Sequence, residues 1–139
     1  MTISKYNYSI ITGVTGLLGS ALAEQFIEDG KKVIGIGRQP KGFLSENVLN
    51  SNNFIFIQKD IKDLLEDDFE GYEIENIFHL ASIVEYAGKD FNEYIKKSIN
   101  LTTAIIELAQ KLNIKTIIFS STMGIAKSPE SKEMIKETS

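Results

Sequence analysis

The chain of 139 residues contains no cysteine, and its only histidine stands at position 79. Without cysteine the protein can form neither a disulfide bond nor a thiolate metal site. One histidine cannot form a histidine cluster around a metal ion. We therefore expect no metal site in this chain.

The chain also has neither a large excess of charge of one sign nor a long apolar run. The net charge is −4 and no block of like charges occurs, so nothing points to nucleic acid or to an anionic membrane as a partner. No apolar run is long enough to span a bilayer, and the N-terminal stretch MTISKYNYS lacks the apolar core of a signal peptide. With 42% hydrophobic and 24% charged residues, the composition is typical of one globular domain, for which we expect a cytoplasmic location.

Strands and helices are expected to alternate along the chain. Apolar runs predict five strands, at 8–12, 31–37, 54–58, 75–81 and 115–121. Apolar residues at helical spacing predict long helices over 17–29 and about 90–112, and a short one over 60–65. A polar link with at most one helical turn is expected around 40–53, and a loop over 127–139.

Several of these strands are unbroken apolar runs, which is typical of a parallel sheet covered on both faces. Right-handed connections then give the strand order 3-2-1-4-5. We therefore predict an α/β fold, a Rossmann-type doubly wound parallel sheet of about five strands within a single domain, 1–139. Such sheets bind ligands at the carboxyl ends of their strands.

The stretch TGVTGLLG, residues 12–19, joins the first predicted strand to the first helix and carries glycines at every third position. Gly13 would allow the tight turn, Gly16 would let the backbone approach a diphosphate, and Gly19 would let the helix pack against the sheet. The N–H groups and positive dipole end of that helix would then face the phosphates. No Gly-Lys-Ser/Thr follows, so this is not a Walker loop. A tight turn without a ligand is the alternative.

The other predicted strands also end in small or polar residues. These ends are Gly37 and Arg38, Asp60 and Ile61, His79 to Ser82, and Ser120 to Thr122. Because the carboxyl ends of parallel strands meet at one edge of the sheet, the agreement between strands favours nucleotide binding at that edge.

In these pieces the chain resembles the extended short-chain dehydrogenases/reductases, also called NAD-dependent epimerases/dehydratases. The matching motifs occur in order from about Tyr8 to Met123: TGVTGLLG, Asp60-Ile61, HLAS at 79–82, SINLTTA at 98–104 and IIFSST at 117–122. The resemblance implies that the glycine loop, with Thr15, Leu17 and Leu18 beside its glycines, holds the pyrophosphate of the cofactor.

The resemblance implies roles for residues beyond the loop. Asp60 and Ile61 would contact the adenine, with an N-cap of the short helix as the alternative role of Asp60. The remaining expected cofactor contacts are Leu80, Ala81 and Ser82 on the nicotinamide side, the helix residue Asn100, and Ser120. Asn100 could instead merely cap or bend its helix. His79 is expected to be a packing residue at a strand end rather than a catalytic group.

The end of the second strand bears on the choice between NADP and NAD. Relatives that prefer NAD carry an acidic residue there, which holds the ribose hydroxyls, whereas this chain has Gly37 and then Arg38. An arginine can pair bidentately with a 2′-phosphate, so NADP is favoured over NAD. Lys41 is a second candidate phosphate contact. A solvated surface arginine is the alternative interpretation.

The catalytic tyrosine of this family, followed four residues later by a lysine that lowers its pKa, has no match here. None of the five tyrosines has a lysine at that spacing. In the family this pair follows the fifth strand, ahead of the later strands and the substrate region. We therefore expect an incomplete domain that is inactive alone and takes a small-molecule substrate only when the missing part is supplied.

Thr122, with its neighbour Ser121, matches the Ser/Thr that hydrogen-bonds the reacting oxygen in the family. Hydroxyls that satisfy backbone groups are the alternative. The resemblance thus implies the dinucleotide-binding part of an epimerase, dehydratase or reductase acting on a nucleotide sugar or a small carbonyl or hydroxyl compound. A non-catalytic NADP(H)-binding sensor or regulatory module is the alternative, and the oligomeric state is left open.

Overall fold

The computed structural model describes residues 7–82 and 90–121. In chain order their elements are β1 (Asn7–Thr12), α1 (Leu17–Glu28), β2 (Lys32–Gly37), α2 (Glu46–Leu49), β3 (Phe54–Gln58), the 3₁₀ turns η2 (Ile61–Asp63) and η3 (Glu66–Phe69), β4 (Glu73–His79), α3 (Phe91–Lys111) and β5 (Ile117–Phe119). The predicted strands and long helices are all present, with ends shifted by about two residues at most. The predicted loop over 127–139 lies outside the described residues.

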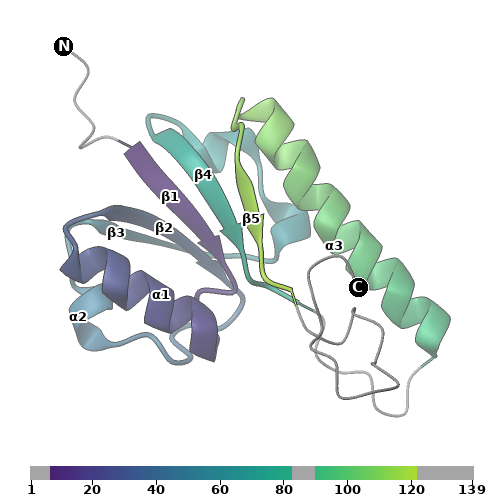
Figure 1. Ribbon diagram of the computed structural model, residues 1–139, viewed down its shortest axis with the longest axis horizontal. Helices are drawn as coiled ribbons and strands as arrows, with labels where there is room; N and C mark the ends of the chain where they lie inside the picture. The colour runs from purple at the N-terminus through teal and green to yellow at the C-terminus, as the bar shows by residue number, and fades with distance from the viewer. Residues whose placement is uncertain (1–6, 83–89, 122–139) are drawn as a thin grey trace, which may run out of the picture.

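The five strands form one parallel sheet in the order β3-β2-β1-β4-β5, which confirms the predicted order (Figure 1). In the centre of the sheet, Thr12 at the end of β1 lies between Ile36 of β2 and His79 of β4. His79 in turn pairs with Phe119 of β5. The register therefore brings the carboxyl ends of four strands to the same edge.

Apolar side chains of the sheet pack on both of its faces. On one face, Ile10 and Ile77 belong to a core completed by Ile105 and Leu108 of α3. On the other, Ile11 and Val33 pack with Ala23 of α1 and Val48 of α2. Figure 1 shows α1 and α2 on one side of the sheet and α3 on the other. This two-sided cover explains why the strands are nearly continuous apolar runs.

The ends of the long helices follow local backbone chemistry. Gly30, just beyond α1, has a φ of +76°, a left-handed conformation in which glycine carries no steric cost. Asp90 precedes α3 and accepts a hydrogen bond from the N–H of Asn92 at 3.0 Å. Asn113 follows α3 with a φ of 57°, a conformation that asparagine tolerates better than most residues.

The single short helix predicted over 60–65 is wrong in detail. The chain forms η2 and η3 instead, because Leu64 between them is extended, with a φ of −70° and a ψ of 136°. Each 3₁₀ turn has its own side-chain cap. Asp60 accepts from the N–H of Lys62 at 3.3 Å, and Asp68 accepts from the N–H of Leu65 at 2.9 Å.

The apolar pattern that predicted α3 is divided between the core and the surface. Ile105 and Leu108 are buried, whereas four apolar side chains of α3 are exposed, namely Phe91, Ile95, Ile99 and Ile106. Phe119 of β5 is also 46% exposed. No helix within 7–82 and 90–121 combines the length and apolarity needed to cross a membrane, α3 included.

Candidate functional site

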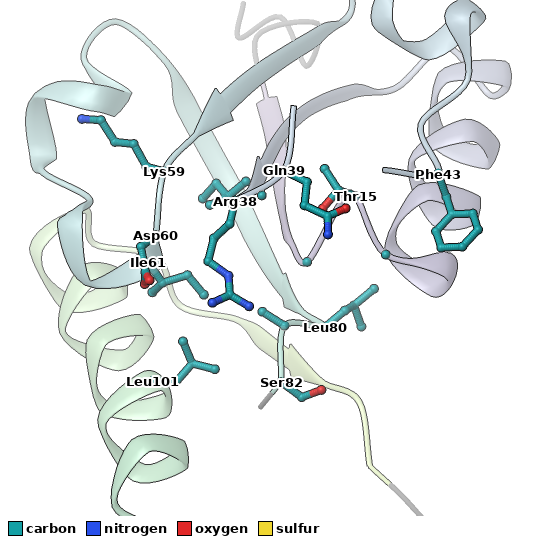
Figure 2. A pocket seen from close by; sticks show the side chains of 15 residues that line it. Thr15, Arg38, Gln39, Phe43, Lys59, Asp60, Ile61, Leu80, Ser82 and Leu101 are labelled. Carbon is teal, nitrogen blue, oxygen red and sulfur yellow. The ribbon is translucent and has the colours of Figure 1, made fainter. Parts of the chain in front are cut away.

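A cavity of about 370 Å³ opens at the carboxyl edge of the sheet (Figure 2). The last two residues of β2 and residues that follow β1, β2, β3 and β4 line it, together with one residue of α3. They are Gly13, Thr15, Gly16, Ile36, Gly37, Arg38, Gln39, Phe43, Lys59, Asp60, Ile61, Leu80, Ala81, Ser82 and Leu101. The cavity therefore lies where ligands bind in doubly wound sheets.

Gly13 permits a close contact between the loop after β1 and the turn after β4. Its φ is +66°, and a Cβ added there would lie 2.9 Å from the backbone nitrogen of Ala81. Gly19 permits a second close contact, because a Cβ added to Gly19 would collide with the carbonyl group of Gly13. Gly19 thus allows close packing as expected, but the partner is the loop itself rather than the sheet.

Gly13 and Gly30 offer a matched pair of substitutions. Both have a positive φ, but no atom lies within 4 Å of a Cβ built at Gly30. Gly30→Ala should therefore lose only the conformational cost of about 1–2 kcal/mol. Gly13→Ala should lose clearly more in the free energy of unfolding, measured in urea, because the backbone of Ala81 must also move. Equal losses for the two variants would contradict this account of Gly13.

Gly16 differs from the other two glycines of the loop. It is the exposed N-cap residue of α1, with an extended backbone (φ −78°, ψ 174°) that any residue adopts. A Cβ built there meets only the carbonyl oxygen of Gly13, at 3.3 Å. The N–H groups of Leu17 and Leu18 follow in the first turn, where helices leave donors without an internal acceptor. The dihedral angles do not require glycine at 16, but a Cβ there would press on this backbone oxygen, which would have to shift by a few tenths of an ångström.

Thr15 contributes to the site from a buried position. A Cβ added to Gly37 would lie 2.7 Å from the Cγ2 of Thr15, so the small residue at the end of β2 makes room for this side chain. The carbonyl of Thr15 accepts a hydrogen bond from the N–H of Phe43 at 2.9 Å. Thr15 thereby joins the glycine loop to the loop after β2.

Arg38 follows β2 and extends its guanidinium into the cavity (Figure 2). Within 7–82 and 90–121 this side chain makes no ion pair. The carbonyl of Arg38 accepts a hydrogen bond from Nε2 of Gln58 at 3.3 Å, which ties the end of β2 to β3. Asp60 is the only acidic residue among the described residues that line the cavity. Among the described residues, the positive charge that Arg38 brings to the cavity therefore has no ion-pair partner.

Of the two lysines near the cavity, Lys59 lines it and Lys41, the predicted phosphate contact, does not. Lys41 does not line it, and its Nζ binds Glu46 at 2.7 Å. Lys59 does line it, although no motif in the sequence singled it out. Its Nζ lies 2.8 Å from Oδ1 of Asp68, and this hydrogen bond, with that of the Leu65 N–H, lowers the pKa of the Asp68 carboxyl.

Asp60 and Ile61 lie where the resemblance expects them, at the end of β3 and on the cavity wall. The side chain of Asp60 also caps η2, as the alternative role predicted. Both oxygens of a carboxylate can accept, so one role does not exclude the other. Contact with an adenine ring stays a prediction.

The turn after β4 brings Leu80, Ala81 and Ser82 to the cavity, whereas His79 points into the protein. His79 is 3% exposed, and its ring meets the ring of Phe119 edge-on at 5.1 Å between centroids. Burial lowers the pKa of His79. His79 is thus a buried residue at a strand end, as predicted.

The remaining predicted residues lie away from the cavity or beyond the described residues. Leu17 and Leu18 are exposed at the start of α1, and Asn100 is exposed on α3. Ser120 and Ser121 are exposed after β5, and Thr122 lies outside the described residues. None of the described residues in this group lines the cavity.

Sequence reasoning missed Ile36, Gln39, Phe43, Lys59 and Leu101 as lining residues, and it noted Gly37 only as the end of a strand. Gln39 and Phe43 belong to the loop that continues from Arg38, and Lys59 directly precedes Asp60, so adjacency to a predicted residue was the available signal. Leu101 stands beside Asn100 on α3, and no signal in the sequence separates these two neighbours.

Comparison with known proteins gives one family over almost the whole chain. Residues 9–139 match the sequence model of the NAD dependent epimerase/dehydratase family. The chain is 29% identical over 143 residues to UDP-glucuronate 4-epimerase of Thermodesulfobacterium geofontis, with 93% of this chain and 44% of that protein covered. It is 30% identical over 128 residues to an uncharacterized UDP-glucose epimerase of Bacillus subtilis, with 84% and 40% covered.

Solved structures agree with this result. UDP-glucose 4-epimerase of Thermotoga maritima, determined with UDP-glucose, is similar with a TM-score of 0.72 and 28% identity over 91% of this chain and 41% of that one. The enzyme WbmG of Bordetella bronchiseptica, determined with NAD, has a TM-score of 0.64 over 81% and 36%, and at 23% identity it shows the fold alone. The chain spans about two fifths of the length of these relatives.

Proposed function

Since this chain belongs to the NAD-dependent epimerase/dehydratase family, we propose that it binds a nicotinamide adenine dinucleotide at the carboxyl edge of its sheet. Gly16 is the observation that carries the proposal. It lines the cavity at the start of α1, its dihedral angles suit any residue, and among the described residues a Cβ there would meet only the carbonyl oxygen of Gly13, at 3.3 Å. A diphosphate that approaches the helix N-terminus closely would require the absence of a side chain there.

Residues that line the cavity are available for each part of such a cofactor. The loop from Gly13 to Gly16 and the first-turn N–H groups of α1 would hold the pyrophosphate. The adenosine half would extend toward Arg38 and Asp60, and the nicotinamide half toward the turn that carries Ala81. When bound, the nicotinamide ring accepts and returns a hydride. This chain's own residues would bind and orient that ring.

A nucleotide sugar is the substrate class that we propose for the complete enzyme. The relatives named above as epimerases act on UDP-sugars by their names, and one of them was determined with UDP-glucose. The chain itself has no tyrosine followed four residues later by a lysine. Without that acid–base pair we expect the 139-residue chain to bind the dinucleotide but not to turn over a sugar nucleotide.

A fluorescence titration of the purified 139-residue chain with NADPH, and separately with NADH, tests this proposal. We expect saturable binding of both, with NADPH the tighter ligand. Binding of neither would overturn the proposed function. Incubation with UDP-glucose and NAD⁺ should give no epimerised sugar. Measurable turnover by this chain would contradict the prediction that it is inactive alone.

A non-catalytic dinucleotide sensor is the second candidate, because binding of the dinucleotide, the activity that these residues support, does not itself require the acid–base pair. A sensor would bind the dinucleotide in the same way as the enzyme, but the full-length gene product would catalyse no reaction. The coding sequence that follows codon 139 separates the two candidates. A tyrosine with a lysine four residues later would favour the enzyme, and a stop codon would favour the sensor.

A further inference from the structure

One buried hydroxyl joins the ends of the two central strands. Oγ1 of Thr12, at the end of β1, accepts hydrogen bonds from the N–H groups of Leu80 and Ala81, each at 3.1 Å. The same oxygen lies 2.7 Å from Nδ1 of His79, at the end of β4. Thr12 is 0% exposed, so no solvent competes for these bonds.

The number of bonds fixes the position of the protons. A hydroxyl group has two acceptor lone pairs and one hydrogen to donate. Both lone pairs of Thr12 are used by the N–H groups of Leu80 and Ala81, so its hydrogen must point to Nδ1 of His79. Nδ1 therefore carries no proton, and His79 is neutral with its proton on Nε2.

These bonds hold a wall of the cavity. Leu80 and Ala81 both line it, and the backbone between them lies directly against Gly13. A Cβ at Gly13 would approach the carbonyl carbon of Leu80 to 3.1 Å, so there is little room for this turn to shift toward the loop. The hydroxyl of Thr12 opposes movement in the other direction. The spacing between the glycine loop and the turn after β4 thus depends on Thr12.

We propose that Thr12 and neutral His79 are positioning residues, which hold the Leu80–Ala81 turn against the glycine loop in the geometry that dinucleotide binding requires. The inference rests on the proposed function, because it names what keeps that binding site in shape. Neither side chain needs to touch the ligand, since Thr12 is fully buried and His79 points away from the cavity.

Protonation of His79 should break this arrangement. An imidazolium would donate from Nδ1 to an oxygen whose lone pairs are both used, and the hydroxyl hydrogen would lose its acceptor. Burial opposes protonation and lowers the pKa of the ring. Affinity for the dinucleotide should therefore be full at pH 7 and above, and should fall as the pH drops below the usual pKa of about 6.5.

Within residues 7–82 and 90–121, the side chains that contact His79 do not titrate in this range. Thr12 and Phe119, its contacts on β1 and β5, do not ionise. On α3, which covers the same face of the sheet, the charged side chains are all exposed: Glu93, Lys96, Lys97, Glu107 and Lys111. Among the described residues, no charged group contributes to the shift of the pKa of His79.

The first test reads the proton directly. Because His79 is the only histidine, a ¹⁵N-labelled chain without a histidine tag gives ring signals from this residue alone. At pH 7.5 we expect a pyridine-type signal from Nδ1 and a pyrrole-type signal from Nε2. The reverse assignment, or a mixture of the two tautomers, would overturn the proposal.

The second test separates the hydroxyl from the shape of the side chain. Thr12→Val removes the hydroxyl at nearly constant volume, and Thr12→Ser retains it. Calorimetric titration with NAD⁺ at pH 7.5 should show about tenfold weaker binding by the valine variant, the effect expected from about two lost hydrogen bonds. The serine variant should recover most of the affinity. Binding by Thr12→Val at the wild-type level would overturn the proposal.

The third test needs no variant and decides the question if Thr12→Val fails to fold. The affinity of the wild-type chain for NAD⁺, which lacks the 2′-phosphate that titrates near pH 6, should fall with the same midpoint as the ring signals of His79. Constant affinity while His79 becomes protonated would overturn the proposal. Absence of NAD⁺ binding at pH 7.5 would instead count against the proposed function, and the tautomer would still test the hydrogen bonds.

Discussion

Gly16→Val should weaken NADPH binding by about 100-fold or more while the chain stays folded. A branched side chain at Gly16, the N-cap residue of α1, would occupy the space of the diphosphate. Loss of two or more charge-assisted hydrogen bonds from backbone N–H groups corresponds to about 3 kcal/mol or more. Fluorescence titration against NADPH measures the loss.

The stability of the same variant should change little. The backbone at Gly16 is extended, and among the described residues a Cβ there would meet only the carbonyl oxygen of Gly13, at 3.3 Å, which would have to shift by a few tenths of an ångström. Loss of a glycine N-cap should lower the free energy of unfolding by about 1 kcal/mol at most. Thermal unfolding followed by circular dichroism checks this part of the prediction.

Two further substitutions serve as controls for Gly16→Val. Gly16→Ala should give a smaller loss of affinity, because only one methyl group enters the space of the ligand. Gly13→Ala should lose stability and binding together, since its Cβ meets the backbone of Ala81. If Gly16→Val binds NADPH as tightly as the wild type, the glycine loop is a turn without a ligand.

The fold could be predicted from the sequence because its signals are local. Apolar runs mark the strands, and a glycine that needs a positive φ marks the end of α1. The strand order follows from the handedness of the connections, which hardly varies among proteins. The turns η2 and η3 were not predictable, because they depend on which side chain caps which N–H. The bond between Asp68 and Lys59, for example, joins residues nine positions apart, beyond the reach of a local helix signal.

The site residues could be predicted only where the path of the backbone alone places them at the edge of the sheet. Residues directly after a strand, such as Arg38 and Asp60, lie at the edge of the sheet whatever their side chains do. Asn100 and Leu101 show the limit, since adjacent residues of a helix point about 100° apart and tertiary packing decides which one faces the cavity. The bond between Thr12 and His79 joins residues 67 positions apart. No spacing in the sequence could have predicted it.

Arg38→Ala should weaken NADPH binding by about 10- to 100-fold and leave NADH binding nearly unchanged. A bidentate pair between the guanidinium and a 2′-phosphate would contribute about 1.5–3 kcal/mol, and NADH has no such phosphate. Parallel titrations with the two ligands measure the ratio of affinities. The difference between wild type and variant should shrink as salt is raised, because the interaction is between exposed charges.

Arg38→Ala should affect ligand binding alone, because the structure shows no other role for the Arg38 side chain. Its side chain forms no ion pair within the described residues, and the bond from Gln58 goes to its backbone carbonyl, which alanine keeps. The free energy of unfolding should therefore change by less than about 0.5 kcal/mol. Arg38→Lys keeps the charge but not the planar pair of donors, so its NADPH affinity should lie between those of the wild type and the alanine variant.

Tighter binding of NADH than of NADPH by the wild type would refute this role of Arg38 without touching the role of Gly16. The two residues address different parts of the ligand: Gly16 makes room for the diphosphate that NAD and NADP share, and Arg38 faces the position where they differ. A chain that loses both ligands through Gly16→Val but is indifferent to Arg38→Ala would bind NAD as its family name implies, with Arg38 a solvated side chain at the rim of the cavity.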